Sequence, residues 1–133
     1  MPDQPTKVWG YEMREPYYTE HLYFQQNPHV TGMAAEDSRI ILNPYSTLSE
    51  GEKNAVARNE AARLYMREKN MQFGFKPTEE QSKSFQGTPY ADRPHDINST
   101  IIARALSGDP SAGQLTPEQQ QIVEQLRTQL EGR

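Results

Sequence analysis

Several features are missing from this 133-residue sequence, and each absence excludes a class of protein. The chain contains no cysteine, which excludes disulfide bonds and thiolate metal sites. No run approaches the roughly 20 apolar residues of a membrane-spanning helix, so we expect no membrane insertion. The first ten residues, MPDQPTKVWG, lack the apolar segment of a signal peptide. The formal net charge of -4 argues against nucleic acid as the main ligand, because phosphate binding needs a basic surface.

Apolar residues are also scarce. They make up 34% of the chain, against roughly 45–50% in typical globular domains when glycine is included. Ten prolines and eight glycines interrupt the apolar segments that do occur. Ordering a residue costs about 1.5 kcal/mol, whereas apolar burial returns only about 25 cal/mol per Å². We therefore expect a small core that partner proteins complete.

Aromatic residues are concentrated near the start of the chain. Residues 1–18 contain prolines that interrupt helices, together with Trp9, Tyr11, Tyr17 and Tyr18. Tyrosine and tryptophan are favoured at interfaces because each combines a large apolar body with one polar tip. We predict an extended arm that lies on a neighbouring protein or on the chain's own body, with these four aromatic residues as its anchors.

The next segment predicts a short helix and a β-hairpin. Thr19 can cap a helix over residues 19–28, with Leu22, Tyr23 and Phe24 packing inward. Residues 29–44 contain the β-branched run RIIL between polar turn residues, which indicates a hairpin.

Three further segments have strong helix signals. A helix over 49–69 begins with the capping box Ser49-x-x-Glu52, and one over 95–108 ends at a glycine. The last helix begins at Thr116-Pro117, with a cap and a proline in its first turn. A weaker signal predicts a short helical turn within 76–85.

The predicted fold is mainly α with one small β-hairpin, three to five helices and an extended N-terminal arm. We divide the chain into an arm, a helix–hairpin–long helix unit, a linker with a short helix, and a C-terminal helix pair: 1–18, 19–75, 76–94 and 95–133.

The centre of the long helix, Asn59-Glu60-x-x-Arg63, has the spacing of a zinc-peptidase helix but not its ligands. Such a helix needs histidines at i and i+4, and arginine cannot bind zinc. The three histidines of the chain are not paired at ligand spacing. We therefore expect no metal, no cofactor and no zinc catalysis.

Two structural roles remain open for Glu60 and Arg63. They can form an ion pair on the helix surface, or they can act with Asn59 as a clamp. In the clamp, Arg63 reaches Glu36 or Asp37 of the hairpin, or makes an equivalent bond across a subunit boundary. A catalytic alternative uses Glu60, or the pair Glu36 and Asp37, for glycosidic cleavage. That chemistry needs one carboxyl in an apolar pocket and a second that stays ionised.

Two stretches of the chain resemble short proteins of unassigned role from tailed bacteriophages: NPHVTGMAAEDSRIILNPYSTLSEGEKNAVARNEAARLYM and STIIARALSGDPSAGQLTPEQQ. The shared pattern runs from Gly-Met through Ile-Leu-Asn-Pro and Asn-Glu-x-x-Arg to Ser-Gly-Asp-Pro-Ser, and covers roughly residues 27–125. The resemblance implies a phage source. It implies no reaction, cofactor or established site.

These observations together predict a non-enzymatic structural protein of a tailed-phage virion, in the capsid, neck or tail. Its partners would be larger virion proteins, contacted in multiple symmetric copies. Two alternatives stay open: a phage-encoded lytic or host-directed factor that uses Glu60 or Glu36/Asp37, and a small regulator that binds a host protein.

Overall fold

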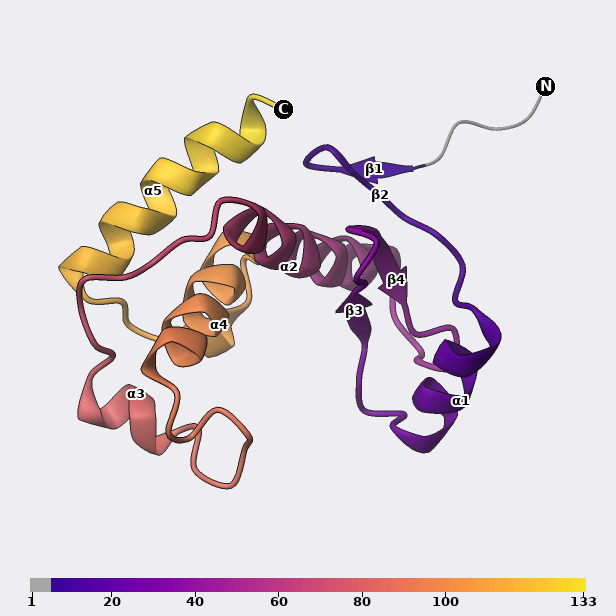
Figure 1. Ribbon diagram of the computed structural model, residues 1–133, viewed down its shortest axis with the longest axis horizontal. Coiled ribbons are helices and arrows are strands. Elements are labelled where there is room, and N and C mark those ends of the chain that lie inside the picture. Colours follow the sequence, from indigo (N-terminus) through magenta and orange to yellow (C-terminus); the bar gives the residue numbers. More distant parts are fainter. Residues whose placement is uncertain (1–5) are drawn as a thin grey trace.

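Helices dominate the part of the chain that the computed structural model describes, residues 6–133 (Figure 1). The predicted mainly α fold with a small β-hairpin is confirmed. A second, two-residue strand pair also occurs within the arm. In chain order the elements are β1 (Lys7–Val8), β2 (Tyr11–Glu12), α1 (Tyr18–Gln26), β3 (Gly32–Ala34), β4 (Ile40–Leu42), α2 (Glu50–Glu68), α3 (Glu79–Lys83), α4 (Pro94–Ser107), the 3-10 turn η1 (Pro110–Ala112) and α5 (Pro117–Glu131).

Helix α2 is the central element, and it crosses the middle of the molecule in Figure 1. Its capping box forms as predicted, because Ser49 Oγ accepts the Glu52 N–H and Glu52 Oε1 accepts the Ser49 N–H, both at 3.1 Å. The buried face of α2 includes three alanines, whose small side chains allow α4 and the hairpin to approach closely. The main core therefore forms around this helix.

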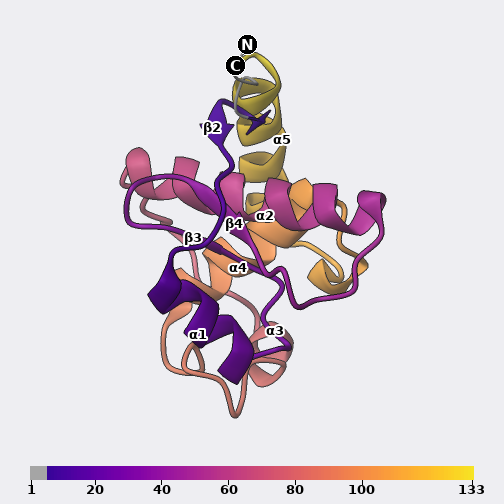
Figure 2. The same ribbon diagram turned by 90° about the vertical axis from the view of Figure 1, so that its right-hand side faces the viewer.

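The β3–β4 hairpin lies between α2 and α1, an arrangement that both ribbon views show (Figures 1 and 2). Side chains alternate between the two faces of a strand. Ile40 therefore packs into the main core with α2, whereas Ile41 packs against Phe24 of α1. Gly32 contacts α2 so closely that a Cβ there would lie 2.7 Å from Val56 Cγ1.

Helices α4 and α5 complete the other side of the core. Leu126 and Leu130 of α5 belong to the same cluster as Ile102 of α4. A buried glutamine, Gln119, donates from Nε2 to Asn98 Oδ1 at 3.0 Å and joins α5 to α4 through polar groups. Such a network satisfies polar atoms that would be costly to bury alone.

The described part of the arm folds back onto the molecule. A two-residue turn with positive φ at Trp9 (50°) and Gly10 (87°) joins β1 to β2, as in the turns that match the twist of a hairpin. Met13 then forms a parallel bridge with Ile40, where the Arg14 N–H donates to the Ile40 carbonyl at 3.0 Å. The arm thereby lies along the free side of β4. Residues 1–5 of the predicted arm lie outside the described residues.

Two local predictions for α1 are wrong. The helix begins at Tyr18 after the cap residue Tyr17, not after Thr19, because Glu20 Oε1 accepts the Tyr17 N–H at 2.7 Å. Of the three apolar residues expected to pack inward, only Phe24 is buried, and Leu22 and Tyr23 stay 40% and 42% exposed. A short hairpin offers room for few side chains of the helix that covers it.

Candidate functional site

A cleft of about 900 Å³ lies along one face of α2. Residues of α2 between 52 and 63 line it at helical spacing, and segment 29–32 and the end of α4 with its following turn also line it. Pro89 and Tyr90, from the loop before α4, contribute as well. The cleft therefore combines segments that are far apart in the sequence, and α2 supplies several of its polar side chains, Glu60 among them.

Glu60 lies in this cleft and is partly buried. No hydrogen bond or ion pair to its carboxylate occurs among residues 6–133 at hydrogen-bonding or ion-pair distance. Burial raises the pKa of the Glu60 carboxyl, and the positive charge of Arg63 opposes that shift only in part. The predicted surface ion pair between these two residues is thus wrong as a direct contact.

Arg63 makes its contacts elsewhere. Its Nε donates to Asn59 Oδ1 at 2.9 Å on the same helix, and its Nη2 donates to Thr100 Oγ1 of α4 at 3.4 Å. The predicted bond from Arg63 to Glu36 or Asp37 is wrong, because the guanidinium turns toward α4. Asn59 and Arg63 therefore connect two helices, whereas Glu60 remains outside this connection.

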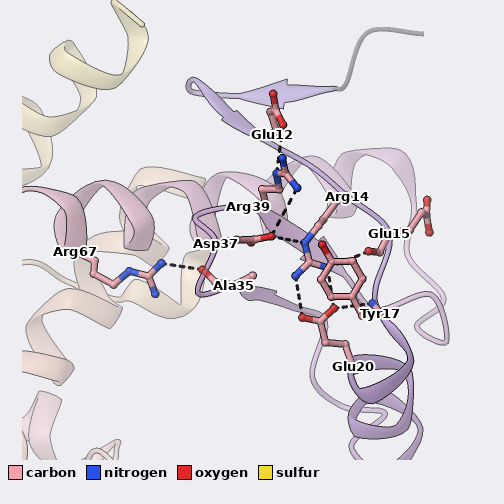
Figure 3. A network of polar contacts seen from close by, with 9 residues as sticks. All are labelled: Glu12, Arg14, Glu15, Tyr17, Glu20, Ala35, Asp37, Arg39 and Arg67. Carbon is pink, nitrogen blue, oxygen red and sulfur yellow. Dashed lines mark hydrogen bonds and ion pairs between the residues drawn. The ribbon is translucent and has the colours of Figure 1, made fainter. Parts of the chain in front are cut away.

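The contact between α2 and the hairpin is made by a different arginine, one turn further along. Arg67 Nη2 donates to the Ala35 carbonyl at 2.8 Å (Figure 3). Arg63 and Arg67 are four residues apart and share a helix face. The sequence analysis therefore predicted the correct face of α2 for the contact with the hairpin, but it named Arg63 in place of Arg67.

A network of charged residues joins the arm, α1 and the hairpin turn (Figure 3). Arg14 donates to both carboxylate oxygens of Glu20, at 2.8 and 3.0 Å, and from Nε to Asp37 Oδ2 at 2.9 Å. Arg39 lies 3.4 Å from Glu12 and 3.8 Å from Asp37. The hydrogen bonds from Arg14 hold the pKa of Glu20 below its ordinary value.

This network bears on the catalytic alternative. Asp37 is held by two arginines, and neither it nor Glu36 lines the cleft of Glu60. The other carboxylates of the cleft have structural partners: Glu52 accepts the Ser49 N–H, and Asp109 accepts the Ser111 N–H at 2.9 Å. No group of three or more histidine, aspartate or glutamate side chains suited to a metal occurs within residues 6–133.

The four aromatic residues predicted as anchors divide into two pairs. Tyr11 is 6% exposed, and its hydroxyl donates to Glu68 Oε2 at 2.8 Å, while Trp9 packs against the main core. Tyr17 and Tyr18 are 57% and 77% exposed. The first pair therefore contacts the chain itself, and the second pair faces solvent.

Sequence reasoning missed other members of this exposed group. We use the name α1 aromatic surface for the large apolar side chains that stay exposed on and beside α1, namely Tyr17, Tyr18, Leu22, Tyr23 and Tyr45. Tyr45 belongs to it because its hydroxyl lies 3.0 Å from His21 Nδ1 of α1. The place of Leu22 in this group could have been predicted, because Leu22 is four residues from Tyr18 and therefore shares its helix face.

Comparison of the chain with protein families, curated protein sequences and solved structures finds no match. Among residues 6–133, no helix is both long enough and apolar enough to cross a membrane. The resemblance of two sequence stretches to phage proteins stays a prediction.

Proposed function

We propose that the chain is a non-enzymatic structural component of a tailed-phage virion, where it joins larger proteins of the capsid, neck or tail. The observation that carries the proposal is the α1 aromatic surface. Its five large side chains include Tyr18, which is 77% exposed. Large apolar side chains that stay exposed together on and beside one short helix commonly mark an interaction site. The resemblance of two sequence stretches to short phage proteins supports the virion as the place of that interaction.

The contacts that fix α1 in place favour a binding role for the α1 aromatic surface. Helix α1 buries one of its own side chains, Phe24, yet Arg14 and Glu20 connect it to the arm and the hairpin turn. The Arg14 guanidinium also lies 3.8 Å from the centre of the Tyr17 ring. A tyrosine held in one orientation loses little conformational freedom when a partner binds, so it is suited to anchor an interface.

Mass spectrometry of purified virions tests the proposal. We expect the chain in the particle at a fixed copy number that reflects the symmetry of its neighbours. Tyr18→Asp and Leu22→Asp should keep the folded circular dichroism spectrum but reduce incorporation into particles. Gln125→Asp, an exposed change on α5 outside the α1 aromatic surface, should be incorporated like the wild type. Absence of the chain from virions would refute the virion role. Normal incorporation of both tyrosine and leucine variants would refute the binding surface.

A second candidate function is a phage-encoded lytic factor, which the position of Glu60 in the cleft favours. One requirement of glycosidic cleavage, a carboxyl with a raised pKa, is met by this residue. The expected second carboxylates, Glu36 and Asp37, are not in the cleft. Turbidity of cell-wall suspensions tests this function: wild-type protein should clear them and Glu60→Gln should not. No clearing by wild-type protein removes the candidate.

A further inference from the structure

The outer edge of β3 has unused backbone hydrogen-bonding groups. Asn43 N–H donates to the Thr31 carbonyl and Ala35 N–H donates to the Arg39 carbonyl, both at 2.9 Å. Bonded and non-bonded pairs alternate in an antiparallel ladder. Gly32 and Ala34 therefore direct their N–H and C=O groups away from β4. No backbone or side-chain partner for these groups occurs among residues 6–133.

The two edges of the hairpin differ in what covers them. The arm occupies the outer side of β4 through the Met13–Ile40 bridge. Beside the outer edge of β3, by contrast, the segment from His29 to Gly32 opens on the cleft. A free strand edge is a template for a further strand.

Glu60 lies on the helix face beneath that edge. Gly32 contacts α2 at Val56, and Glu60 is one helical turn beyond Val56 on the same face. In a strand added to β3, the residues opposite Gly32 and Ala34 would direct their side chains toward the same face, and therefore toward α2. A long side chain at such a position would extend along α2 to Glu60.

The charges of the cleft determine which side chain fits. Arg63 is bound by Asn59 and Thr100, and Arg104 lies 5.2 Å from the centre of the Phe85 ring. Glu60 has no such partner within the described residues, 6–133. A cationic side chain would therefore find a carboxylate that no cation among residues 6–133 contacts, in partly buried surroundings where charge-assisted hydrogen bonds are strong.

We propose that the outer edge of β3 and the adjoining cleft bind an extended segment of a partner protein as an added strand, with a lysine or arginine of that segment contacting Glu60. This site is separate from the α1 aromatic surface and does not depend on the proposed virion role. Strand addition derives affinity from main-chain hydrogen bonds and specificity from the alternate side chains.

Titration of the ¹⁵N-labelled full chain with the blocked peptide Ser-Thr-Val-Lys-Val-Thr-Ser tests the proposal by NMR. We expect the amide resonances of Gly32 and Ala34 to shift. Two matched peptides separate the components of binding. Norleucine in place of lysine should weaken binding about tenfold or more, which corresponds to loss of a partly buried charge pair. N-methylation of alternate peptide amides should abolish binding, because it removes the main-chain donors.

Protein variants provide an independent control. Glu60→Gln should weaken the lysine peptide to the level of the norleucine peptide, whereas Glu36→Gln, an exposed carboxylate outside the cleft, should leave binding unchanged. No resonance shift at millimolar lysine peptide overturns the proposal. Equal binding of the N-methylated peptide overturns strand addition, and equal binding of the norleucine peptide overturns the role of Glu60.

Discussion

Replacing Arg14 with methionine should loosen the arm and α1 together. The guanidinium makes two hydrogen bonds to Glu20 and one to Asp37, and it also donates to the Glu15 carbonyl at 3.1 Å. Methionine keeps much of the aliphatic length but removes all four bonds. The arm and α1 would then be joined to the hairpin mainly through the Met13 bridge and the burial of Phe24.

The expected loss in the free energy of unfolding follows from how exposed Arg14 and its partners are. The side chains of Arg14 and Glu20 are 12% and 19% exposed, whereas that of Asp37 is 37% exposed. Breaking a fully buried pair costs about 3–5 kcal/mol, and breaking an exposed pair costs about 0.2–1 kcal/mol. Because this pair lies near the surface, we expect Arg14→Met to lower the free energy of unfolding by about 1–2 kcal/mol. That corresponds to a fall of about 5 °C in Tm for a chain of this size.

The pH dependence provides a second check. Arg14 lowers the pKa of Glu20 from 4.5, so the native protein binds fewer protons there than the unfolded chain does. This stabilisation is fully present above the unfolded pKa and is lost as the pH falls through the lowered folded pKa. The difference in stability between wild type and Arg14→Met should therefore be largest at pH 7 and shrink below about pH 4.

Chemical denaturation at pH 7 and pH 3, followed by circular dichroism, measures this difference. Trp9, the one tryptophan of the chain, reports on arm docking through its fluorescence. Arg39→Met is the matched control, because that side chain is 43% exposed and its contacts are 3.4 and 3.8 Å long. If Arg14→Met destabilises no more than Arg39→Met, or equally at both pH values, the reasoning is refuted.

Three other changes test the core and the cleft. Gly32→Ala should destabilise by about 1–3 kcal/mol, because its Cβ would meet Val56, and Val56→Ala should restore part of the loss in thermal denaturation. Leu126→Ala, at a residue 1% exposed, should cost about 3 kcal/mol in urea denaturation. Burial raises the pKa of Glu60 above 4.5, so native stability falls as the pH rises through that raised value. Glu60→Gln should therefore become progressively more stable than wild type above pH 5, and a constant difference would contradict this.

The long helices were predictable because their signals are local. Ser49-x-x-Glu52 begins α2, and Thr116 Oγ1 accepts the Gln119 N–H at 3.1 Å where α5 begins. Gly108, with φ of 80°, ends α4 in the left-handed conformation that glycine adopts readily. Each signal acts over a few residues, so the sequence alone was enough.

The packing of the arm was not predictable, because its partners are distant in the sequence. Arg14 and Asp37 are 23 residues apart, and Tyr11 and Glu68 are 57 apart. The sequence showed the charges and the aromatic rings, but not which of them would meet. For the same reason Arg63 was expected at the hairpin, whereas it contacts Thr100, 37 residues further along the chain.

The sequence analysis singled out one residue of the candidate cleft, but it did not predict which segments form the cleft. Glu60 was singled out from the pattern Asn-Glu-x-x-Arg, and it does line the cleft. The cleft itself needs α2, the segment before β3 and the turn after α4 to come together. Periodicity along α2 shows which residues share a face, but not which other segments that face will meet.

The aromatic residues near Tyr11 explain how such a polar chain forms a core. Tyr11 and Tyr65 are both buried, and the Arg133 guanidinium lies 4.6 and 5.2 Å from the centres of their rings. Glu68 accepts the Tyr11 hydroxyl and lies 3.6 Å from Arg133. Tyrosine and arginine both combine apolar surface with polar ends, so they bury area that aliphatic residues would otherwise supply. Part of the burial expected from partners is thus provided by the chain itself. The expectation that partners complete the core is therefore weaker than the composition suggested, and the partners proposed above would bind exposed surfaces instead.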